Sequence, residues 1–344
     1  MESAETLTAM RYHDGWMSPS RALAYAFGLL VGAASCKSAR SVGETSAPAS
    51  SRPSVGSARN KCSPHCEGFR AFTKICNVPY PLLELSGLAV SRTHTDILFA
   101  HNDSGDVARF FAFDSEGHEH GEFAVENAEA DDWEDIGTGP CGDGSACIFI
   151  GDIGDNKYRR QRGSTATPGY VIYAIREPAL DPKGGKTNAH AEKLGFIYPD
   201  GPHNSETLLV DSRTGDLFLV TKTRSGQSAV YQYPMPQRPN EMVTLVKVAD
   251  FNVPTGGDVQ ITGGDIHPCE MRVVLRTYDR GFELSDPNAR SVGDLFATTP
   301  HEVALPFDEQ GEAFIYTADG HGLFTSSESP NGTSPPLRRA ACND

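Results

Sequence analysis

The stretch ELSGLAVSRTHTDILFAHND, residues 84–103, predicts two β-strands joined by a polar turn. It opens on Glu84, continues with apolar residues, turns through SRTHTD at 91–96 and becomes apolar again at ILFA, 97–100. Short apolar runs on either side of turn-forming residues are typical of a β-hairpin. The same order recurs four more times, so this stretch is one copy of an internal repeat.

The other copies also open on a carboxylate residue, at Glu134, Glu206, Asp265 and Glu312. Two further strands follow most copies, and successive openers lie 50, 72, 59 and 47 residues apart. Repeats of this size with four strands each predict an all-β protein, a β-propeller, with five blades favoured over six. The last copy lacks an outer strand, and we expect the segment FRAFTKICNVPY, residues 69–80, to supply it and close the ring.

Composition agrees with a turn-rich β protein, because 34 Gly and 23 Pro are spread over 344 residues. The formal charge is −15, from 45 Asp and Glu against 30 Lys and Arg. Nucleic acid is therefore excluded as the main partner, since phosphate binding needs clustered basic residues. We expect a soluble monomer that attracts cations to its carboxylate clusters.

The N-terminal region has the order of an export signal. The run SRALAYAFGLLVGAASC, residues 20–36, has Arg21, then mostly apolar residues, then small residues before Cys36. Its apolar part is too short to span a bilayer, and no other stretch approaches a span. AASC resembles a bacterial lipobox, which makes Cys36 the lipid-attachment residue; a plain secretory signal is the alternative. The start codon can be Met1 or Met17.

Three parts of the chain follow from this signal. Residues 1–36 are the signal, residues 37–60 form a flexible tether rich in Ser, Ala and Pro, and residues 61–344 form one domain. We expect an exported protein in the periplasm or at the cell surface, held at a membrane only through its lipid.

Export favours disulfide bonds, and seven cysteines remain besides Cys36. Cys141 and Cys147 bracket a tight turn and should pair. A bond between Cys62 and Cys66 is favoured over a zinc half-site, since no matching Cys or His pair follows. Ring closure predicts a third bond, Cys76–Cys342. An odd count leaves one thiol free, for which we select Cys269.

Hairpin geometry predicts a functional surface. The start of a first strand lies beside the end of the second, so the carboxylate openers and the second-strand ends share one face of the ring. Carboxylates that converge there need a compensating cation, and oxygen ligands suit Ca²⁺. The alternatives are that Asp and Gly in GDIGDN only make turns, or that Lys222, Arg276 and Arg280 neutralise the ring. The predicted metal ligands are Glu84, Asp103, Glu134, Asp135, Asp152, Asp155, Asn156, Glu206, Asp265 and Glu312.

Histidine offers a general base for hydrolysis at the same surface. His101 ends a second strand and His203 precedes the third opener, although a surface loop histidine is the commoner case. Zincin, serine-esterase and P-loop motifs are absent from the sequence. Trp133, among acidic residues, could stack a sugar, but buried anchoring is favoured.

Several strings carry a family resemblance: SGLAVSR, FAHNDSGD, DDWEDI, IGDIGDN, TGGDI, VVLRTYD and GEAFIY. Together they resemble a family of exported bacterial β-propeller proteins, often predicted as lipoproteins, for which no activity can be transferred. More distantly the chain is similar to propellers that include calcium-dependent lactonases, phosphotriesterase-like enzymes and phytase-like proteins. Two functions follow as expectations. The chain is an envelope lipoprotein that binds a ligand or an envelope protein on its acidic face, or it is a calcium-dependent hydrolase of phosphoesters or lactones.

Overall fold

The computed structural model describes residues 66–103, 105–157, 160, 169–181, 184–329 and 331–343. These residues belong to one compact unit, Val55–Asp344. Among them, regular structure is almost entirely β-strand, with one helix of four residues, α1 (Val292–Leu295). The all-β class predicted from the repeats is therefore confirmed.

The largest sheet holds two successive groups of four strands. Strands within each group are antiparallel neighbours, whereas β5 and β9 pair in parallel and join the groups at their outer strands. A short strand, β13, also pairs with β9 in parallel. The first group is β2 (Leu85–Val90), β3 (Ile97–Asn102), β4 (Arg109–Asp114) and β5 (Glu119–Glu126). The second group is β6 (Trp133–Pro140), β7 (Ala146–Asp152), β8 (Tyr170–Arg176) and β9 (Lys186–Ile197), and β13 spans Met242–Thr244.

Three further antiparallel sheets have four strands each. The third group is β10 (Ser205–Val210), β11 (Leu217–Thr221), β12 (Gln227–Gln232) and β14 (Val246–Asn252). The fourth is β15 (Gly263–Ile266), β16 (Arg272–Arg276), β17 (Gly281–Ser285) and β18 (His301–Val303). The fifth is β19 (Gly311–Tyr316), β20 (Gly322–Ser327), β21 (Pro336–Ala341) and, from the other end of the sequence, β1 (Thr73–Asn77).

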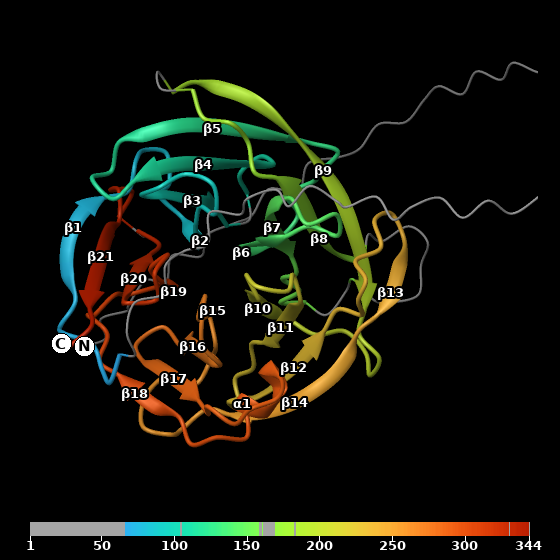
Figure 1. The fold of residues 1–344 in the computed structure, drawn as a ribbon, viewed down its shortest axis with the longest axis vertical. Coiled ribbons are helices and arrows are strands. Elements are labelled where there is room, and N and C mark those ends of the chain that lie inside the picture. Colours follow the sequence, from blue (N-terminus) through green and yellow to red (C-terminus); the bar gives the residue numbers. More distant parts are fainter. Residues whose placement is uncertain are drawn as a thin grey trace, which may run out of the picture. The chain divides into compact units, whose positions relative to one another are not determined.

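The first strand of each group faces a common centre (Figure 1). Each of these first strands contacts the first strand of the next group: β2 contacts β6, β6 contacts β10, β10 contacts β15, β15 contacts β19, and β19 contacts β2. The apolar core is divided in the same way, because one buried cluster lies between each pair of neighbouring groups. The inner strands are buried at nearly every position because neighbouring groups pack against both of their faces, and the polar strand starts lie at the centre.

The expected strand from residues 69–80 is present as β1, which pairs with β21 at the outer edge of the fifth group. The two ends of the described chain therefore complete one sheet together, as the sequence predicted. This pairing protects the edge of β21, which would otherwise present unpaired backbone groups.

The disulfide predictions are partly wrong. Cys141 and Cys147 are bonded, but Cys342 is bonded to Cys66, and Cys76 is a free thiol. The reason is the antiparallel register of β1 and β21, which places Cys76 opposite Leu337. Cys342 lies opposite Phe69 instead, within reach of Cys66.

The pairing of Cys62 with Cys66 is excluded by the bond from Cys66 to Cys342. Cys269, predicted as the free thiol, is also disulfide-bonded. Cys36, Cys62, the signal and the tether lie outside the described residues.

Candidate functional site

Three of the five openers occupy the same structural position. Glu134, Glu206 and Glu312 are the second residues of β6, β10 and β19, and at each of them the pairing with the next strand shifts register. A bulge of this kind leaves one extra residue outside the ladder and re-aims its side chain. The three side chains interact electrostatically, and each residue is only 5% exposed.

The first opener, Glu84, does not occupy this position. It precedes β2 and is exposed, and the register shift falls at Ser86. Ser86 donates a hydrogen bond from its hydroxyl to the backbone oxygen of Glu134, so it joins β2 to β6.

The fourth opener, Asp265, lies deeper in its strand. It is the third residue of β15, which pairs with β16 without a bulge. Its carboxylate accepts hydrogen bonds from the backbone N–H groups of Ile266 and, on β19, Tyr316, at 2.8 and 3.0 Å. Asp135 does the same between β6 and β10, where it accepts from Ile136 and Leu208. The carboxylates of Asp135 and Asp265 thus accept hydrogen bonds from buried backbone N–H groups and link neighbouring groups, so their oxygens stabilise the fold.

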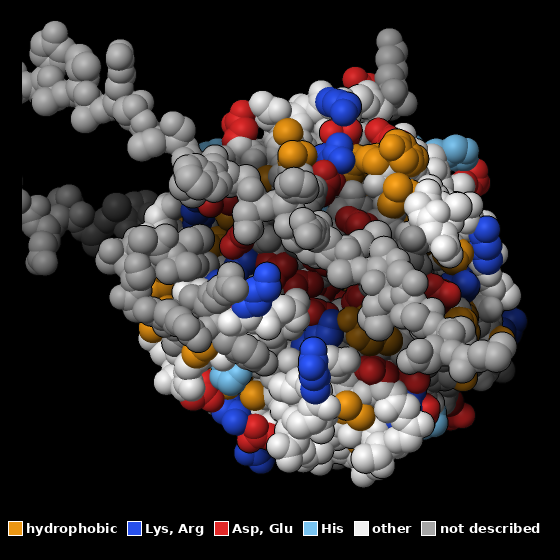
Figure 2. All heavy atoms as spheres, turned by 180° about the vertical axis from the view of Figure 1, so that it is seen from behind, with side chains coloured by type: hydrophobic (Ala, Val, Ile, Leu, Met, Phe, Trp, Pro, Cys, Tyr) orange, Lys and Arg blue, Asp and Glu red, His pale blue; other side chains and the backbone are white. Residues whose placement is uncertain are grey.

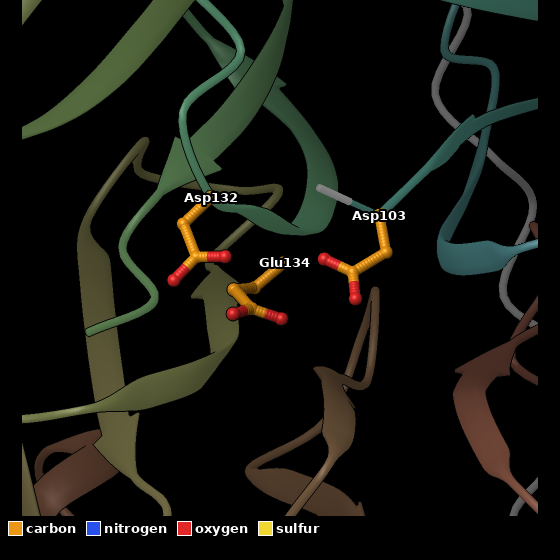
Figure 3. A group of neighbouring side chains, drawn as sticks. All are labelled: Asp103, Asp132 and Glu134. Atoms are coloured by element: carbon orange, nitrogen blue, oxygen red, sulfur yellow. The ribbon is translucent and has the colours of Figure 1, made fainter. Parts of the chain in front are cut away.

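Asp103, Asp132 and Glu134 form a compact carboxylate group (Figure 3). One ligand oxygen of each lies within 4.8 Å of the others. Asp103 follows β3, and its backbone N–H donates to the backbone oxygen of Glu84 at 2.9 Å. Asp132 directly precedes β6, and Glu134 is the second residue of that strand, at its bulge. In Figure 3 the carboxylate of Glu134 lies between the other two.

Glu134 is the central side chain of this group. Its carboxylate accepts no hydrogen bond from any residue that the structure describes, although the residue is 5% exposed. Burial, followed by the charges of Glu206, Asp103 and Asp132, holds the pKa of Glu134 well above its ordinary value. Burial likewise raises the pKa of Asp132 to about 6, against the neighbouring Arg160. A buried carboxyl without donors is costly to ionise unless a cation approaches it.

Glu206, Glu312 and Glu328 extend the group across the centre. Glu206 forms an ion pair with Lys222, whose ammonium also lies 2.6 Å from the hydroxyl of Tyr278. Glu312 has no hydrogen-bond partner among the described residues, and burial and Glu206 hold its pKa well above its ordinary value. Burial and the charge of Asp103 raise the pKa of Glu328 to about 7.

We call this surface the acidic hollow. It is made by Asp103, Asp132, Glu134, Glu206, Glu312 and Glu328, with Lys222 as its cation. Figure 2 shows acidic side chains at the bottom of a central hollow, with basic side chains beside them. Lys222 pairs with Glu206, and the positive charges of Arg160 and Arg276 act on the pKa values of Asp132 and Glu312. Six carboxyl groups therefore face three basic side chains, and the hollow keeps an excess of negative charge when these groups ionise.

The GDIGDN motif contributes mainly through its second glycine. A Cβ on Gly154 would lie 2.0 Å from Oε1 of Glu134 and 2.5 Å from Oδ2 of Asp132. The acidic residues of the motif have other partners. Asp152 pairs with Arg160 at 2.6 Å, Asp155 accepts from the hydroxyl of Tyr170 at 2.8 Å, and Asn156 accepts from Asn204 at 3.3 Å.

The other two predicted counter-charges differ in their relation to the hollow. Arg276 is fully buried and donates to backbone oxygens of Ala313, Ser326 and Tyr278, and its positive charge opposes the rise in the pKa of Glu312. Arg280 pairs with the exposed Glu302 at 2.9 Å. Of the three predicted bases, only Lys222 forms an ion pair with a carboxylate of the hollow.

The two candidate histidines do not line the hollow. His101 is completely buried, its Nδ1 lies 2.8 Å from the backbone oxygen of Asn102, and its ring meets Trp133 edge-on. His203 is hydrogen-bonded to Asp200 at 2.9 Å and packs against Tyr198 and Tyr231. Trp133 is 1% exposed and donates to the backbone oxygen of Glu129, so buried anchoring is its role.

Sequence reasoning did not select Asp132, Gly154 or Glu328 individually. Asp132 and Gly154 stand in two of the strings that carry the family resemblance, DDWEDI and IGDIGDN, and Glu328 directly follows β20. For Asp132 the available signal was its i, i+2 spacing to Glu134. For Gly154 there was none, because the close contact arises from a different strand.

The geometry of the carboxylate group fits a hard divalent cation. Oxygens within 4.8 Å of one another can share one ion, because Ca²⁺ takes six to eight oxygens at about 2.3–2.6 Å. Three carboxylates, each binding through one or both oxygens, would supply about half or more of that shell. Mg²⁺ would use fewer protein oxygens and keep more water.

No family model matches the chain, and no curated protein matches it either. Within the described residues, helices of the length and apolar character that a membrane span requires are absent.

Proposed function

We propose that this chain is an exported envelope lipoprotein that binds a divalent cation, Ca²⁺ in the first place, in its acidic hollow. The bound cation then supports capture of a ligand or an envelope protein on that face. The observation that carries the proposal is the buried carboxylate of Glu134, which faces Asp103 and Asp132 and has no donor among the described residues.

The proposal includes a five-bladed β-propeller, in which each four-stranded group is one blade. Five such groups, a closed circle of contacts among their first strands and a shared fifth sheet made from both ends of the described chain support it. The parallel pairing of β5 with β9 is the departure from this plan, since it joins the first two blades at their outer edges.

Charge supports a cation over an anionic ligand. Burial, and then repulsion between neighbouring carboxylates, raises the pKa values of Asp132 and Glu134. A metal ion among Asp103, Asp132 and Glu134 would oppose both effects by favouring the ionised forms. Lys222 compensates Glu206, whereas the carboxylate of Glu134 forms no ion pair with any described residue, so the charge that a cation would offset lies at Glu134.

Binding is preferred to hydrolysis as the function. The hydrolase alternative needs a base beside the metal, with room for water. His101 is buried under the hollow and His203 is engaged by Asp200 and Tyr231, so neither supports that role.

Calorimetric titration of the full chain with Ca²⁺, after treatment with a chelator, tests the metal site. We expect one site, and a rise in melting temperature when Ca²⁺ is in excess. A hundredfold excess over the dissociation constant stabilises by about 2.7 kcal/mol. For a domain of this size that corresponds to a rise of about 5 °C.

Matched variants locate the site. Glu134→Gln keeps the shape of the side chain and should abolish most of the response to Ca²⁺, whereas the exposed Glu241→Gln should leave it unchanged. A melting temperature that responds to neither Ca²⁺ nor Mg²⁺ in the unsubstituted protein would show that the metal proposal is wrong. The hollow would then be a docking surface for a basic partner.

The lipid anchor is tested separately. Cys36→Ser should move the protein from the membrane fraction to the soluble fraction after cell lysis. If the variant still sediments with membranes, the anchor is not at Cys36.

A further inference from the structure

A second pocket lies at the opposite ends of the inner strands, between the first and fifth groups. Its walls are the turn from β2 to β3, residues 91–96, and the turn from β19 to β20, residues 317–321. The pocket has a volume of about 320 Å³, at the lower end of the range for small-molecule sites. Figure 1 shows β2 and β3 beside β19 and β20, and β2 contacts both of those strands.

The turn from β2 to β3 is held in place by one carboxylate. Glu177, just after β8, accepts hydrogen bonds from the backbone N–H of Arg92 at 3.1 Å and from the N–H and hydroxyl of Thr93 at 3.1 and 2.6 Å. The hydroxyl of Ser91 donates to the same side chain. Glu177 therefore fixes the loop through its backbone and hydroxyl groups, and no ion pair joins it to the guanidinium of Arg92.

The guanidinium of Arg92 forms no hydrogen bond or ion pair with any part of the chain that the structure describes. The residue is half-buried and lines the pocket. Most other half-buried or buried arginines of the described chain have a carboxylate or carbonyl partner, such as Asp106 for Arg109 and Glu270 for Arg272. A guanidinium presents five donors in a rigid fork that matches a carboxylate or sulfonate. Burial lowers the pKa of Arg92, and the charges of Glu177 and Asp211 oppose this shift, but no acceptor among the described residues contacts its guanidinium.

Besides Arg92, the lining of the pocket has an apolar part and a charged part. Val90, Leu98 and Phe324 supply the apolar surface, and Arg339 lies over the ring of Phe324 with 5.9 Å to its centroid. The pocket also holds two acidic residues, and both accept hydrogen bonds: Asp96 from Ser115, and Asp319 from Thr317 and His321. Arg92 and Arg339 offset the charges of Asp96 and Asp319. Binding of an anion therefore depends on direct contact with the guanidinium of Arg92.

We propose that this pocket, the Arg92 pocket, binds a small organic anion, with its carboxylate or sulfonate on the guanidinium of Arg92 and its apolar body on Val90, Leu98 and Phe324. The site is separate from the acidic hollow, which lies at the other ends of β2 and β3. It does not depend on the proposed metal.

The probe for this class of ligand is 8-anilinonaphthalene-1-sulfonate, an aromatic sulfonate that fluoresces when its ring is buried. It is titrated into the folded full chain in the presence of Ca²⁺, and the melting temperature of every variant is measured in parallel. We expect one saturable site. Arg92→Met should weaken binding about tenfold or more, because a charge-assisted contact is lost.

Two further variants keep the test decisive. Ala318→Trp places a bulky ring in the turn that lines the pocket and should abolish binding while leaving Arg92 in place. The exposed Arg224→Met removes a charge elsewhere and should bind as the unsubstituted protein does. The proposal is overturned if the folded protein shows no saturable binding, or if Arg92→Met binds as tightly as the unsubstituted protein.

Discussion

At the scale of single residues, the acidic hollow depends on a glycine as much as on its carboxylates. Gly154 follows β7 and its backbone N–H donates to the backbone oxygen of Asp132 at 3.2 Å. The bare backbone approaches Glu134 and Asp132 so closely that no side chain fits between them. Close approach of backbone to a binding group is a recurring reason for glycine.

Gly154→Ala should therefore disable the proposed cation site. Its Cβ would stand 2.0 Å from Oε1 of Glu134, so the carboxylate must move away. We expect at least a tenfold loss of Ca²⁺ affinity by calorimetry. Gly142→Ala is the control, because the nearest neighbour of its Cβ would be 4.0 Å away. Equal affinities in the two variants would contradict this account of Gly154.

The sequence predicted those residues of the candidate site whose location follows from their position in the repeat. Glu134, Glu206 and Glu312 are at matching points of matching hairpins, so one geometric argument covers them. The argument does not hold for Asp265, because β15 begins two residues before it and lacks the bulge. Whether a carboxylate faces the centre or a neighbouring strand depends on contacts between groups, and a single sequence does not contain them.

At the scale of elements, Arg276 ties the fourth group to the fifth. Its guanidinium lies at the end of β16 and donates to Ala313 on β19 at 3.2 Å and to Thr325 on β20 at 2.6 Å. Further bonds go to the backbone oxygens of Thr277, Tyr278 and Ser326. Gly311 leaves the space for it, because a Cβ there would lie 1.5 Å from Nη2.

Arg276→Met should destabilise the protein by about 3 kcal/mol. The substitution keeps much of the apolar volume but leaves several buried carbonyl oxygens without a donor, and each such group costs about 1–3 kcal/mol. Urea unfolding of the full chain measures the change. Arg224→Met, at an exposed position, should stay within about 0.5 kcal/mol of the unsubstituted protein. A loss below about 1 kcal/mol for Arg276→Met would mean that water or nearby side chains replace its bonds.

Strand positions were predictable because turns and apolar runs are local. The apolar runs RFFAFD, GEFAVEN and YVIYAI, residues 109–114, 121–127 and 170–175, are among the further strands that follow the repeat copies, and they correspond to β4, β5 and β8 within about two residues. Register was not predictable. The pairing of β1 with β21 was expected, but its antiparallel register decides which cysteine meets Cys342.

At the scale of the whole molecule, the bond Cys66–Cys342 closes nearly the entire described chain. It spans 276 residues, against 6 for Cys141–Cys147. The chain-entropy relation gives about 5.6 kcal/mol for a loop as long as the first and about 2 kcal/mol for the second, as upper values.

Paired Cys→Ala substitutions should therefore differ in effect. Removal of Cys66 and Cys342 should lower the free energy of unfolding more than removal of Cys141 and Cys147, with the difference measured by denaturant unfolding. If the short bond proves more stabilising, local packing of the turn outweighs closure of the ring.

Proton binding should make the stability of the metal-free protein fall between pH 6.5 and 8. Burial raises the pKa of Asp265 and Glu328 to about 7, from about 4 in an unfolded chain. A group with the higher pKa in the folded state binds more protons when folded, so rising pH removes stability until the folded pKa is passed. For Asp265 this amounts to about 1 kcal/mol over the interval. His267, whose pKa burial lowers to about 4, acts in the opposite direction below pH 6.5, which is why the interval begins there.

Ca²⁺ should reverse this trend, because a cation binds the ionised carboxylates and competes with their protons. Thermal melts in Ca²⁺ and in chelator should therefore diverge as pH rises from 6.5 to 8, with the larger stabilisation at pH 8. In Glu134→Gln the two curves should stay together, while the fall contributed by Asp265 remains. A stabilisation by Ca²⁺ that is greater at pH 6.5 than at pH 8 would contradict binding to the carboxylates of the acidic hollow, since protonation there must weaken it.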